Sequence, residues 1–192
     1  MSLITPCNLV RQDGVLAVRP VRIQDADALF PAMADPALSR FLAWAPHVTV
    51  EETRSVLAAL EGAQSDGKAW HWTVLLNDHP VGLVSLIDVR RTHRTWRLDR
   101  AEMAYWIAPE AQGCGLASRA SAMVADLAFG SLGLEKLLIA NAKDNPSSGR
   151  VAERLGARII GTELRAFEKD GCWHNLIWRE LHRRPAEEES FV

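Results

Sequence analysis

The chain has 192 residues, of which 48% are hydrophobic, with a formal net charge of −2 and a pI near 6.3. This length suffices for one substantial core, so we expect a single domain over residues 1–184 and a disordered acidic tail over 185–192. The mild acidity excludes a dedicated nucleic-acid binder, which usually carries a basic excess. No apolar run approaches the roughly 18 residues that span a bilayer, and the N-terminus lacks a signal pattern, so a cytoplasmic protein without membrane attachment is expected.

The three cysteines are widely separated and odd in number: Cys7, Cys114 and Cys172. None of them forms a Cys-x-x-Cys pair or lies beside a histidine at metal-ligand spacing. We therefore expect neither a disulfide framework nor a metal site.

The first third of the chain predicts a strand followed by helices. Residues 16–21 are typical of a strand, and apolar residues at helical spacing predict a helix over 25–33. Within residues 36–67 a second helical region is expected, because Thr49 followed three positions later by Glu52 resembles a capping box.

The middle of the chain predicts antiparallel strands. Residues 70–76 and 81–89 flank a turn sequence and predict a hairpin, and residues 97–108 predict a longer strand. A basic cluster lies between the last two strands: Arg90, Arg91, His93, Arg94, Arg97 and Arg100. It is either a solvated turn or a contact surface for an acidic partner or ribosomal RNA, and both interpretations remain open.

The last part of the chain alternates between the two element types. It predicts a helix over 118–129, a strand over 136–141, a helix over 147–155, and closing strands near 158–167 and 172–181. The whole order predicts a mixed α/β sheet with no internal repeat.

The turn between a strand and the helix over 118–129 reads Gln112-Gly113-Cys114-Gly115-Leu116-Ala117. Backbone N–H groups at a helix start lack intrahelical partners and lie at the positive end of the helix dipole, so they suit a phosphate group. The turn lacks the Gly-Lys-Ser/Thr ending of a nucleoside-triphosphatase loop. It also lacks the position and the downstream acid of a dinucleotide fold.

The order Gln-x-x-Gly-x-Ala in this turn resembles the acyl-coenzyme A pyrophosphate signature of the GNAT acetyltransferase superfamily. A second stretch, from Asn145-Pro146-Ser147-Ser148 to Gly156, resembles the superfamily's Asn-x-x-Ser motif before a short helix. Three further segments complete the resemblance to the ribosomal-protein N-terminal acetyltransferase (RimJ/RimL-type) branch, which spans residues 16–181: Arg19-Pro20-Val21, the strand Ala101 to Ile107, and the turn Asp170-Gly171-Cys172-Trp173.

This resemblance implies a GNAT acyl-CoA N-acyltransferase fold of class α/β (α+β), with a mixed, mostly antiparallel twisted sheet flanked by helices. It implies a transferase that uses acetyl-CoA and acetylates a protein N-terminal α-amine, with ribosomal proteins favoured. Since one fold hosts many acceptors, a small-molecule amine, polyamine or antibiotic remains an alternative. A non-catalytic acyl-CoA-binding sensor is the second alternative.

The resemblance also assigns the cofactor contacts. The pyrophosphate is expected on the N–H groups of Gln112, Gly113, Cys114, Gly115, Leu116 and Ala117, with Ser118 close behind. The pantetheine amides are expected on the backbone of Trp106 and Ile107, with Asn145 as a further contact. Cys114 is expected to contribute backbone, because no base for a thiol nucleophile is identifiable near it in the sequence.

Acetyl transfer needs one group that takes a proton from the amine and one that returns a proton to the thiolate. By resemblance Glu102 is the expected base, against the alternative of a solvated strand carboxylate. The tyrosine that many superfamily members carry on the helix after the second motif is Ala152 here, and Tyr105 is the single tyrosine in the chain. Ser148 is therefore the expected proton donor or thiolate stabiliser, against the alternative of helix capping.

Trp44 and Trp173 are the expected walls of the acceptor pocket, although tryptophans more often serve packing. His174 stands near a turn where many branch members place an acid, so the amine-binding end of the pocket differs here. A homodimer is a further expectation, with residues 172–181 as an edge strand that pairs across a two-fold axis.

Overall fold

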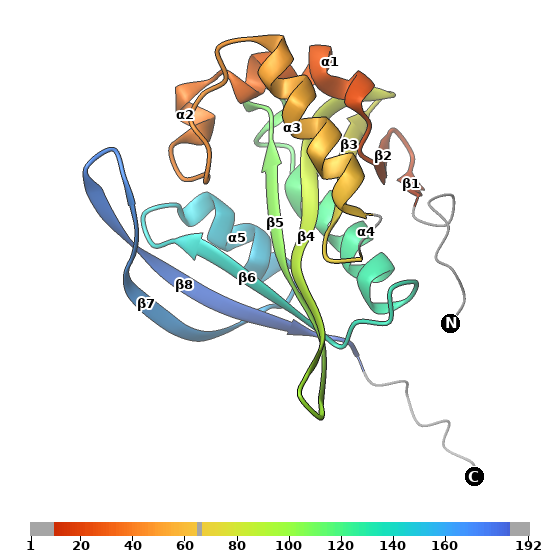
Figure 1. Cartoon of the computed structure of the whole chain (residues 1–192), viewed down its shortest axis with the longest axis vertical. Coiled ribbons are helices and arrows are strands. Elements are labelled where there is room, and N and C mark those ends of the chain that lie inside the picture. Colours follow the sequence, from red (N-terminus) through yellow and green to blue (C-terminus); the bar gives the residue numbers. More distant parts are fainter. Residues whose placement is uncertain (1–9, 65–66, 185–192) are drawn as a thin grey trace.

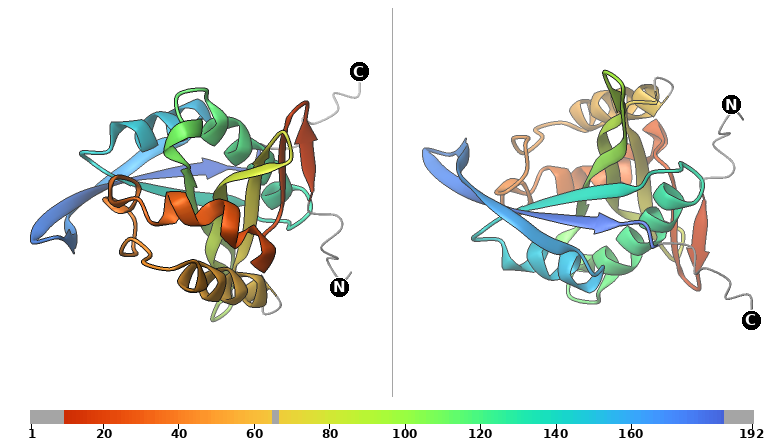
Figure 2. Two further views of the ribbon diagram at one scale, coloured as in Figure 1. Left: turned by 90° about the horizontal axis from the view of Figure 1, so that it is seen from above. Right: turned by 90° about the horizontal axis from the view of Figure 1, so that it is seen from below.

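The computed structural model describes residues 10–64 and 67–184 and contains one eight-stranded sheet (Figure 1). The strand order is β1-β2-β3-β4-β5-β6-β8-β7, and every neighbouring pair is antiparallel except β5 with β6. Helices α1 and α3 lie on one face and α4 and α5 on the other (Figure 2). The predicted mixed, mostly antiparallel sheet flanked by helices is confirmed.

The strands are β1 (Arg11–Asp13), β2 (Leu16–Pro20), β3 (Trp70–Leu76), β4 (His79–His93), β5 (Trp96–Ile107), β6 (Lys136–Ala142), β7 (Arg158–Lys169) and β8 (Cys172–His182). The helices are α1 (Ala26–Met33), α2 (Pro36–Ser39), α3 (Val50–Ala63), α4 (Leu116–Phe129) and α5 (Pro146–Arg154), with short 3-10 turns at Ile23–Asp25 and Pro109–Ala111. Strand β1 was not predicted, because three exposed residues carry no readable alternation.

Two local signals produce the expected elements. Asn77 and Asp78 both have positive φ, at +50° and +63°, so a two-residue turn joins β3 to β4. Strand β3 ends at Leu76 as predicted, whereas β4 begins at His79, two residues earlier than predicted. The hydroxyl of Thr49 accepts a hydrogen bond from the N–H of Glu52 at 3.3 Å, which confirms the predicted helix start of α3.

The core consists of two layers, one on each face of the sheet. One layer packs β2 to β6 against α4 and includes Trp72, Met103 and Leu127, all fully buried. The other packs Leu83 and Trp106 against α1 and α3. Burial of such large apolar side chains contributes about 1.5–3 kcal/mol each to folding, so these layers hold the sheet rigid where β5 passes between them.

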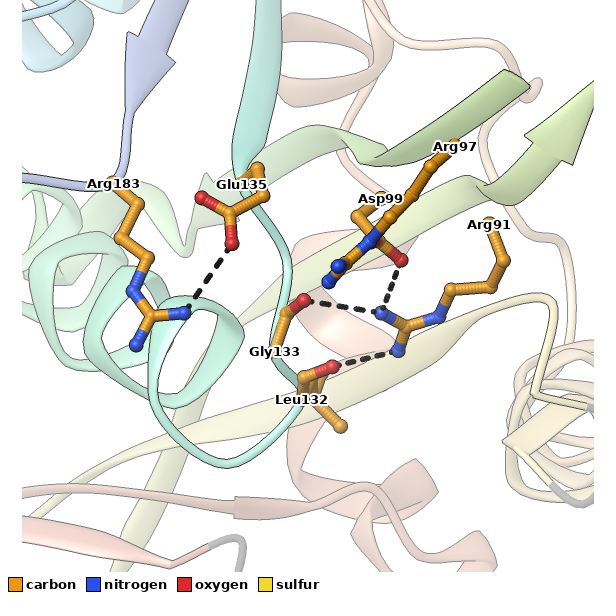
Figure 3. A network of polar contacts seen from close by, with 7 residues as sticks. All are labelled: Arg91, Arg97, Asp99, Leu132, Gly133, Glu135 and Arg183. Carbon is orange, nitrogen blue, oxygen red and sulfur yellow. Dashed lines mark hydrogen bonds and ion pairs between the residues drawn. The ribbon is translucent and has the colours of Figure 1, made fainter. Parts of the chain in front are cut away.

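The arginine-rich hairpin of β4 and β5 is tied to the loop after α4 (Figure 3). Arg91 donates to the carbonyl oxygens of Leu132 at 2.7 Å and Gly133 at 3.4 Å, and both Arg91 and Arg97 pair with Asp99. Burial raises the pKa of Asp99, but hydrogen bonds from the two arginines outweigh it and bring the pKa below its usual value. These arginines therefore serve internal contacts near the turn of the hairpin.

The expectation that residues 172–181 form an edge strand is wrong. Strand β8 pairs with β6 on one side and with β7 on the other, so β7 is the edge at this end of the sheet. The identity of an edge depends on long-range pairing, which the alternation within one strand does not encode. Strand β7 carries exposed apolar side chains at Ile159, Ile160 and Leu164.

The predicted acidic tail over 185–192 and Cys7 lie outside the described residues. Within residues 10–64 and 67–184, no helix is long and apolar enough to cross a membrane.

Candidate active site

Strands β5 and β6 separate in the middle of the sheet. Their parallel ladder holds three pairs among the described residues, from Arg100↔Lys136 to Glu102↔Leu138, although β5 continues to Ile107 and β6 to Ala142. Beyond Glu102 the side of β5 that faces β6 has no ladder partner among the described residues, so an extended chain can pair there by β-type hydrogen bonding.

The backbone of β5 alternates between its two neighbours. A Cβ added to Gly82 of β4 would lie 2.3 Å from the Trp106 carbonyl oxygen, so this carbonyl faces β4. Alternation along a strand then directs the backbone groups of Tyr105 and Ile107 toward the separation from β6. The Ile107 carbonyl accepts a hydrogen bond from the Gln112 side-chain amide at 2.8 Å. This geometry favours Ile107 over Trp106 as a backbone partner for an inserted chain.

The glycine turn leads from β5 into α4 as predicted, and α4 begins at Leu116 rather than at Ser118. Gly113 and Gly115 have φ of +84° and +74°, a conformation that favours glycine. Gly115 is the N-cap of this 14-residue helix. Because glycine has no side chain, the N-cap residue cannot accept a hydrogen bond from the first-turn N–H groups of α4. Gln112, Gly113 and Cys114 are exposed. The turn can therefore present its N–H groups to an anion.

Two side chains beside this turn add to that anion-binding character. The guanidinium of Arg154, at the end of α5, lies 3.9 Å from the place of a Cβ added to Gly115. Ser118 has a buried hydroxyl with no hydrogen-bond partner in the described structure. Arg154 was missed by sequence reasoning, since 39 positions separate it from Gly115 and only the fold brings α5 to the start of α4.

Glu102 is the last residue of β5 that pairs with β6, at the base of the separation. Its side chain is half-buried, and burial followed by repulsion from Asp88 raises its pKa above the usual value. By alternation it shares a face with Ala104, which is exposed, and Trp106, which packs toward α1 and α3. Glu102 is thus a carboxylate of raised basicity on the same face as the exposed Ala104.

On the opposite wall, the start of α5 contacts β5 through a tyrosine. Asn145 is the N-cap of α5, and its side-chain oxygen accepts from the N–H of Ser148 at 3.2 Å, so Asn145 rather than Ser148 caps the helix. The Tyr105 hydroxyl donates to the Ser148 carbonyl oxygen at 2.8 Å, and the two hydroxyl oxygens lie 3.3 Å apart. The structure thus brings together Tyr105 and Ser148, which lie on different elements and 43 positions apart.

The two predicted wall tryptophans lie in different surroundings. Trp44 packs edge-on against Trp106 with ring centroids 6.0 Å apart, and it lines an open groove of about 540 Å³ beside the start of α3. Trp173 is 49% exposed in the β7–β8 hairpin, under the guanidinium of Arg165. Trp44 therefore lies next to the face of the sheet that carries Glu102. Trp173 packs under Arg165 instead of against Trp44.

His174 lies beside the N-terminal end of α5. Its Nδ1 is 2.9 Å from the carboxylate of Asp144, and its ring stacks on Phe167 at 4.9 Å and contacts Phe41 edge-on. Lys169 of the same hairpin donates to the carbonyl oxygens of Leu42 and Trp44. The hairpin and the loop after α2 thus meet next to the candidate site.

Within the described ranges, no group of three or more His, Cys, Asp or Glu side chains could hold a metal ion. Cys114 and Cys172 are free and exposed.

Comparison with known proteins matches residues 16–158 to the acetyltransferase (GNAT) domain. The spermidine N(1)-acetyltransferase of Escherichia coli K12 is 35% identical over 96 residues, which cover 50% of this chain and 49% of that protein. The match therefore spans about half the length of this curated relative. A putative ribosomal N-acetyltransferase of Bacillus subtilis is 32% identical over 109 residues, 57% of each protein.

Solved structures agree at the level of the fold. A ribosomal L7/L12 α-N-protein acetyltransferase (RimL) in complex with coenzyme A superposes with a TM-score of 0.81 at 21% identity, covering 88% of this chain and 95% of that one. Mycobacterium smegmatis RimJ in complex with CoA-disulfide gives 0.79 at 26% identity, covering 88% and 82%. Since the family model covers most of the sheet, the glycine turn and α5, the chain belongs to the GNAT acetyltransferase family.

Proposed function

We propose that this chain is an acetyl-CoA-dependent N-acetyltransferase whose acceptor amine attacks the thioester directly. The preferred acceptor is a protein N-terminal α-amine, with ribosomal proteins favoured. The observation that carries the proposal is the separation of β5 and β6 immediately after Glu102, with the glycine turn at the other end of the same strand. One strand thus offers a phosphate site, a backbone edge and a carboxylate in that order.

In this proposal acetyl-CoA binds as an extended ligand along β5. Its pyrophosphate takes the N–H groups of the turn from Gln112 to Ser118 and the charge of Arg154, which fits the positive φ of the glycines and the missing side-chain cap. Its pantetheine arm lies in the gap beside Ile107. Asn145 remains a proposed contact there, through groups other than the side-chain oxygen that caps α5.

Glu102 is the proposed base. Burial raises its pKa above the usual value, and the ionised fraction of Glu102 that can accept the amine proton rises with pH through that pKa. The amine nitrogen forms a bond to the acetyl carbon, the carbon–sulfur bond breaks, and sulfur leaves with the electron pair. Ser148, at the start of α5, is proposed to lie next to the sulfur atom that leaves as the thiolate.

A small amine is the second candidate acceptor. Its support is the 35% identical spermidine N(1)-acetyltransferase, a higher identity than that of the putative ribosomal N-acetyltransferase. A sensor that binds acyl-CoA without turnover is the third interpretation, and only an assay of turnover distinguishes it from an enzyme.

The first experiment incubates the full chain with labelled acetyl-CoA and a bacterial lysate split into ribosomal, soluble-protein and small-molecule fractions. Mass spectrometry then locates the label. Label on a ribosomal-protein α-amine supports the preferred acceptor, and label on a polyamine moves the acceptor class. Absence of label from every fraction, with coenzyme A demonstrably bound, contradicts catalysis.

Glu102→Gln tests the base. We expect kcat/KM to fall by about 10²-fold or more at neutral pH, with the dissociation constant for coenzyme A unchanged. Glu135→Gln, on an exposed glutamate just before β6, is the matched control and should keep full activity. Unchanged turnover in Glu102→Gln would show that another group takes the proton.

A homodimer is also proposed, now through β7 and not β8. An edge strand offers unpaired backbone groups, and β7 adds the exposed side chains of Ile159, Ile160 and Leu164. Sedimentation of the full chain should give a mass twice that of the monomer, and Leu164→Lys should shift it toward the monomer. A cytoplasmic location accords with this soluble-enzyme proposal.

A further inference from the structure

Tyr105 joins the two walls that separate beyond Glu102. It lies on β5 after the last pair with β6, and its hydroxyl reaches Ser148 on α5, with 2.8 Å to the carbonyl oxygen and 3.3 Å to Oγ. The ring packs against the core layer on the α4 side of the sheet. Glu102 points to the opposite face by alternation, so the two titratable groups flank the strand edge from different sides.

A buried cation lies near this hydroxyl. Arg179 of β8 is 3% exposed and donates to Asn141, and its guanidinium is 3.1 Å from Glu153 of α5. Its Nε has no hydrogen-bond partner in the described structure. Burial raises the pKa of Tyr105, whereas the hydrogen bond from Ser148 and the charge of Arg179 lower it, and the net pKa is above the ordinary value. The phenol therefore holds its proton at neutral pH.

We propose that Tyr105 donates the proton to the thiolate that leaves in acetyl transfer, with Ser148 as the hydrogen-bond partner of the phenol oxygen. This inference rests on the proposed acetyltransferase function and names a catalytic group within it. It changes the expected role of Ser148, whose hydroxyl now supports Tyr105. It also supplies a proton donor in a chain that has Ala152, fully buried, where many superfamily members carry tyrosine.

When the carbon–sulfur bond of the thioester breaks, its electron pair stays on sulfur. The Tyr105 hydroxyl turns from the Ser148 carbonyl to sulfur and gives up its proton, which leaves coenzyme A as a thiol and Tyr105 as a phenolate. The Ser148 hydroxyl donates to that phenolate, and Arg179 lowers the cost of its charge. Solvent returns a proton to the phenolate, and Glu102 releases to solvent the proton it took from the amine.

The relative acidity of the two groups sets the timing of this step. A thiol has an ordinary pKa of about 8.5 and a phenol of about 10, so the proton moves late, once sulfur carries its full negative charge. The bound ligand and the two walls exclude water from the sulfur atom, and this raises the pKa of the thiol as well. The difference between the pKa of the thiol and that of the phenol therefore becomes smaller.

Tyr105 is the single tyrosine of the chain, so biosynthetic incorporation of 3-fluorotyrosine labels this position alone. Coenzyme A added to the labelled protein should shift its one fluorine resonance. Fluorine lowers the pKa of the phenol, so the alkaline limb of the kcat profile should move to lower pH by the change in phenol pKa measured in the same protein. A limb that stays in place overturns the inference.

Tyr105→Phe removes only the hydroxyl. Assayed with acetyl-CoA and with spermidine or an N-terminal ribosomal-protein peptide, whichever the wild-type protein acetylates, its kcat should fall by about 10²-fold. KM for acetyl-CoA and the dissociation constant for coenzyme A should stay within about twofold, because the hydroxyl acts on the departing sulfur. Combined with Ser148→Ala the loss should be less than the product of the two single losses.

Ser147→Ala is the matched control, since Ser147 neighbours Ser148 on α5 and bonds to the exposed Arg150. It should keep the wild-type kcat. If Tyr105→Phe keeps kcat and only lowers the melting temperature, Tyr105 merely fastens α5 to β5 and the inference is overturned while the acetyltransferase function stands. If the wild-type protein binds coenzyme A but acetylates neither acceptor nor any lysate fraction, the proposed function fails and this inference fails with it.

Discussion

Strands β3 and β7 belong to one sheet but lie in opposite surroundings. Six of the seven residues of β3 are buried, because α1 and α3 cover one face of this region and α4 the other (Figure 2). Strand β7 begins with eight consecutive exposed residues, and its hairpin with β8 extends beyond the helices (Figure 1). Side-chain burial on both faces therefore stabilises the β2–β5 half. The β7–β8 hairpin is attached to the rest of the sheet mainly by the pairing of β8 with β6.

This contrast locates the candidate site. Strand β5 belongs to the covered half and β6 is the strand next to the hairpin, and the two separate beyond Glu102. The proposed cofactor position thus lies between a strand of the covered half and the strand that adjoins the exposed hairpin. Under the proposed function, rigid placement of the glycine turn and Glu102 would suit the cofactor, and the exposed hairpin would suit variation in the acceptor.

The largest expected difference between the two strands comes from truncating a large side chain. Trp72 of β3 is 0% exposed and Leu164 of β7 is 74% exposed. Trp72→Ala should lower the free energy of unfolding by about 3–5 kcal/mol, because it removes the packing of a whole indole in the core. Leu164→Ala should change it by less than about 0.5 kcal/mol in dilute protein. Urea denaturation followed by circular dichroism measures both.

A comparable loss in the two variants would mean that β7 is covered in solution. Its most direct explanation would be the proposed dimer, and the loss from Leu164→Ala would then grow with protein concentration.

The contrast was only partly predictable from the sequence. The alternation and the turn at Asn77-Asp78 predicted the β3–β4 hairpin, since both signals are local. Which strand forms the edge was predicted wrongly, because the pairing of β8 with β6 depends on contacts between residues about 40 positions apart. The features of the candidate site likewise fall into local ones, which the sequence indicates, and long-range ones, which it does not.

The glycine turn before α4 was predictable because its signal resides in consecutive residues, and its role as a phosphate site stays a prediction. The contact of Tyr105 with Ser148 and the approach of Arg154 to Gly115 were not readable, because each joins two elements that only the fold brings together. Asn145 was predicted as a cofactor contact, and the structure shows its side chain in a capping hydrogen bond, a local role that the motif allows equally well.

The second expected effect is a pH dependence confined to the buried half. His71 of β3 is 4% exposed, its Nδ1 lies 2.8 Å from the Ser85 hydroxyl, and burial lowers its pKa from 6.5 to about 4. Between pH 6.5 and 4, His71 therefore binds a proton in the unfolded chain but stays neutral in the folded protein. Stability from this group is complete above pH 6.5 and falls by about 3 kcal/mol as the pH drops to 4.

Unfolding in urea at a series of pH values measures this slope. His71→Gln removes the titration and should flatten the curve between pH 6.5 and 4, although it lowers stability at neutral pH. His79→Gln, on an exposed histidine at the start of β4, is the control and should leave the slope as in the wild-type protein. An equal slope in His71→Gln and in the wild-type protein would mean that other groups cause the acid sensitivity.

The smallest effect compares two glycines, and it concerns the wall of the candidate site itself. A Cβ added to Gly82 of β4 would lie 2.3 Å from the Trp106 carbonyl oxygen, and backbone on a buried strand has little room to withdraw. Gly82→Ala should therefore cost about 1–3 kcal/mol and push β5 away from β4, into the gap proposed for the pantetheine. A Cβ on Gly161 of β7 would meet nothing within 4 Å, so Gly161→Ala should be neutral or slightly stabilising. Because only the first substitution displaces Ile107, it should also weaken coenzyme A binding in calorimetry, and equal affinities in the two variants would place the ligand away from this edge of β5.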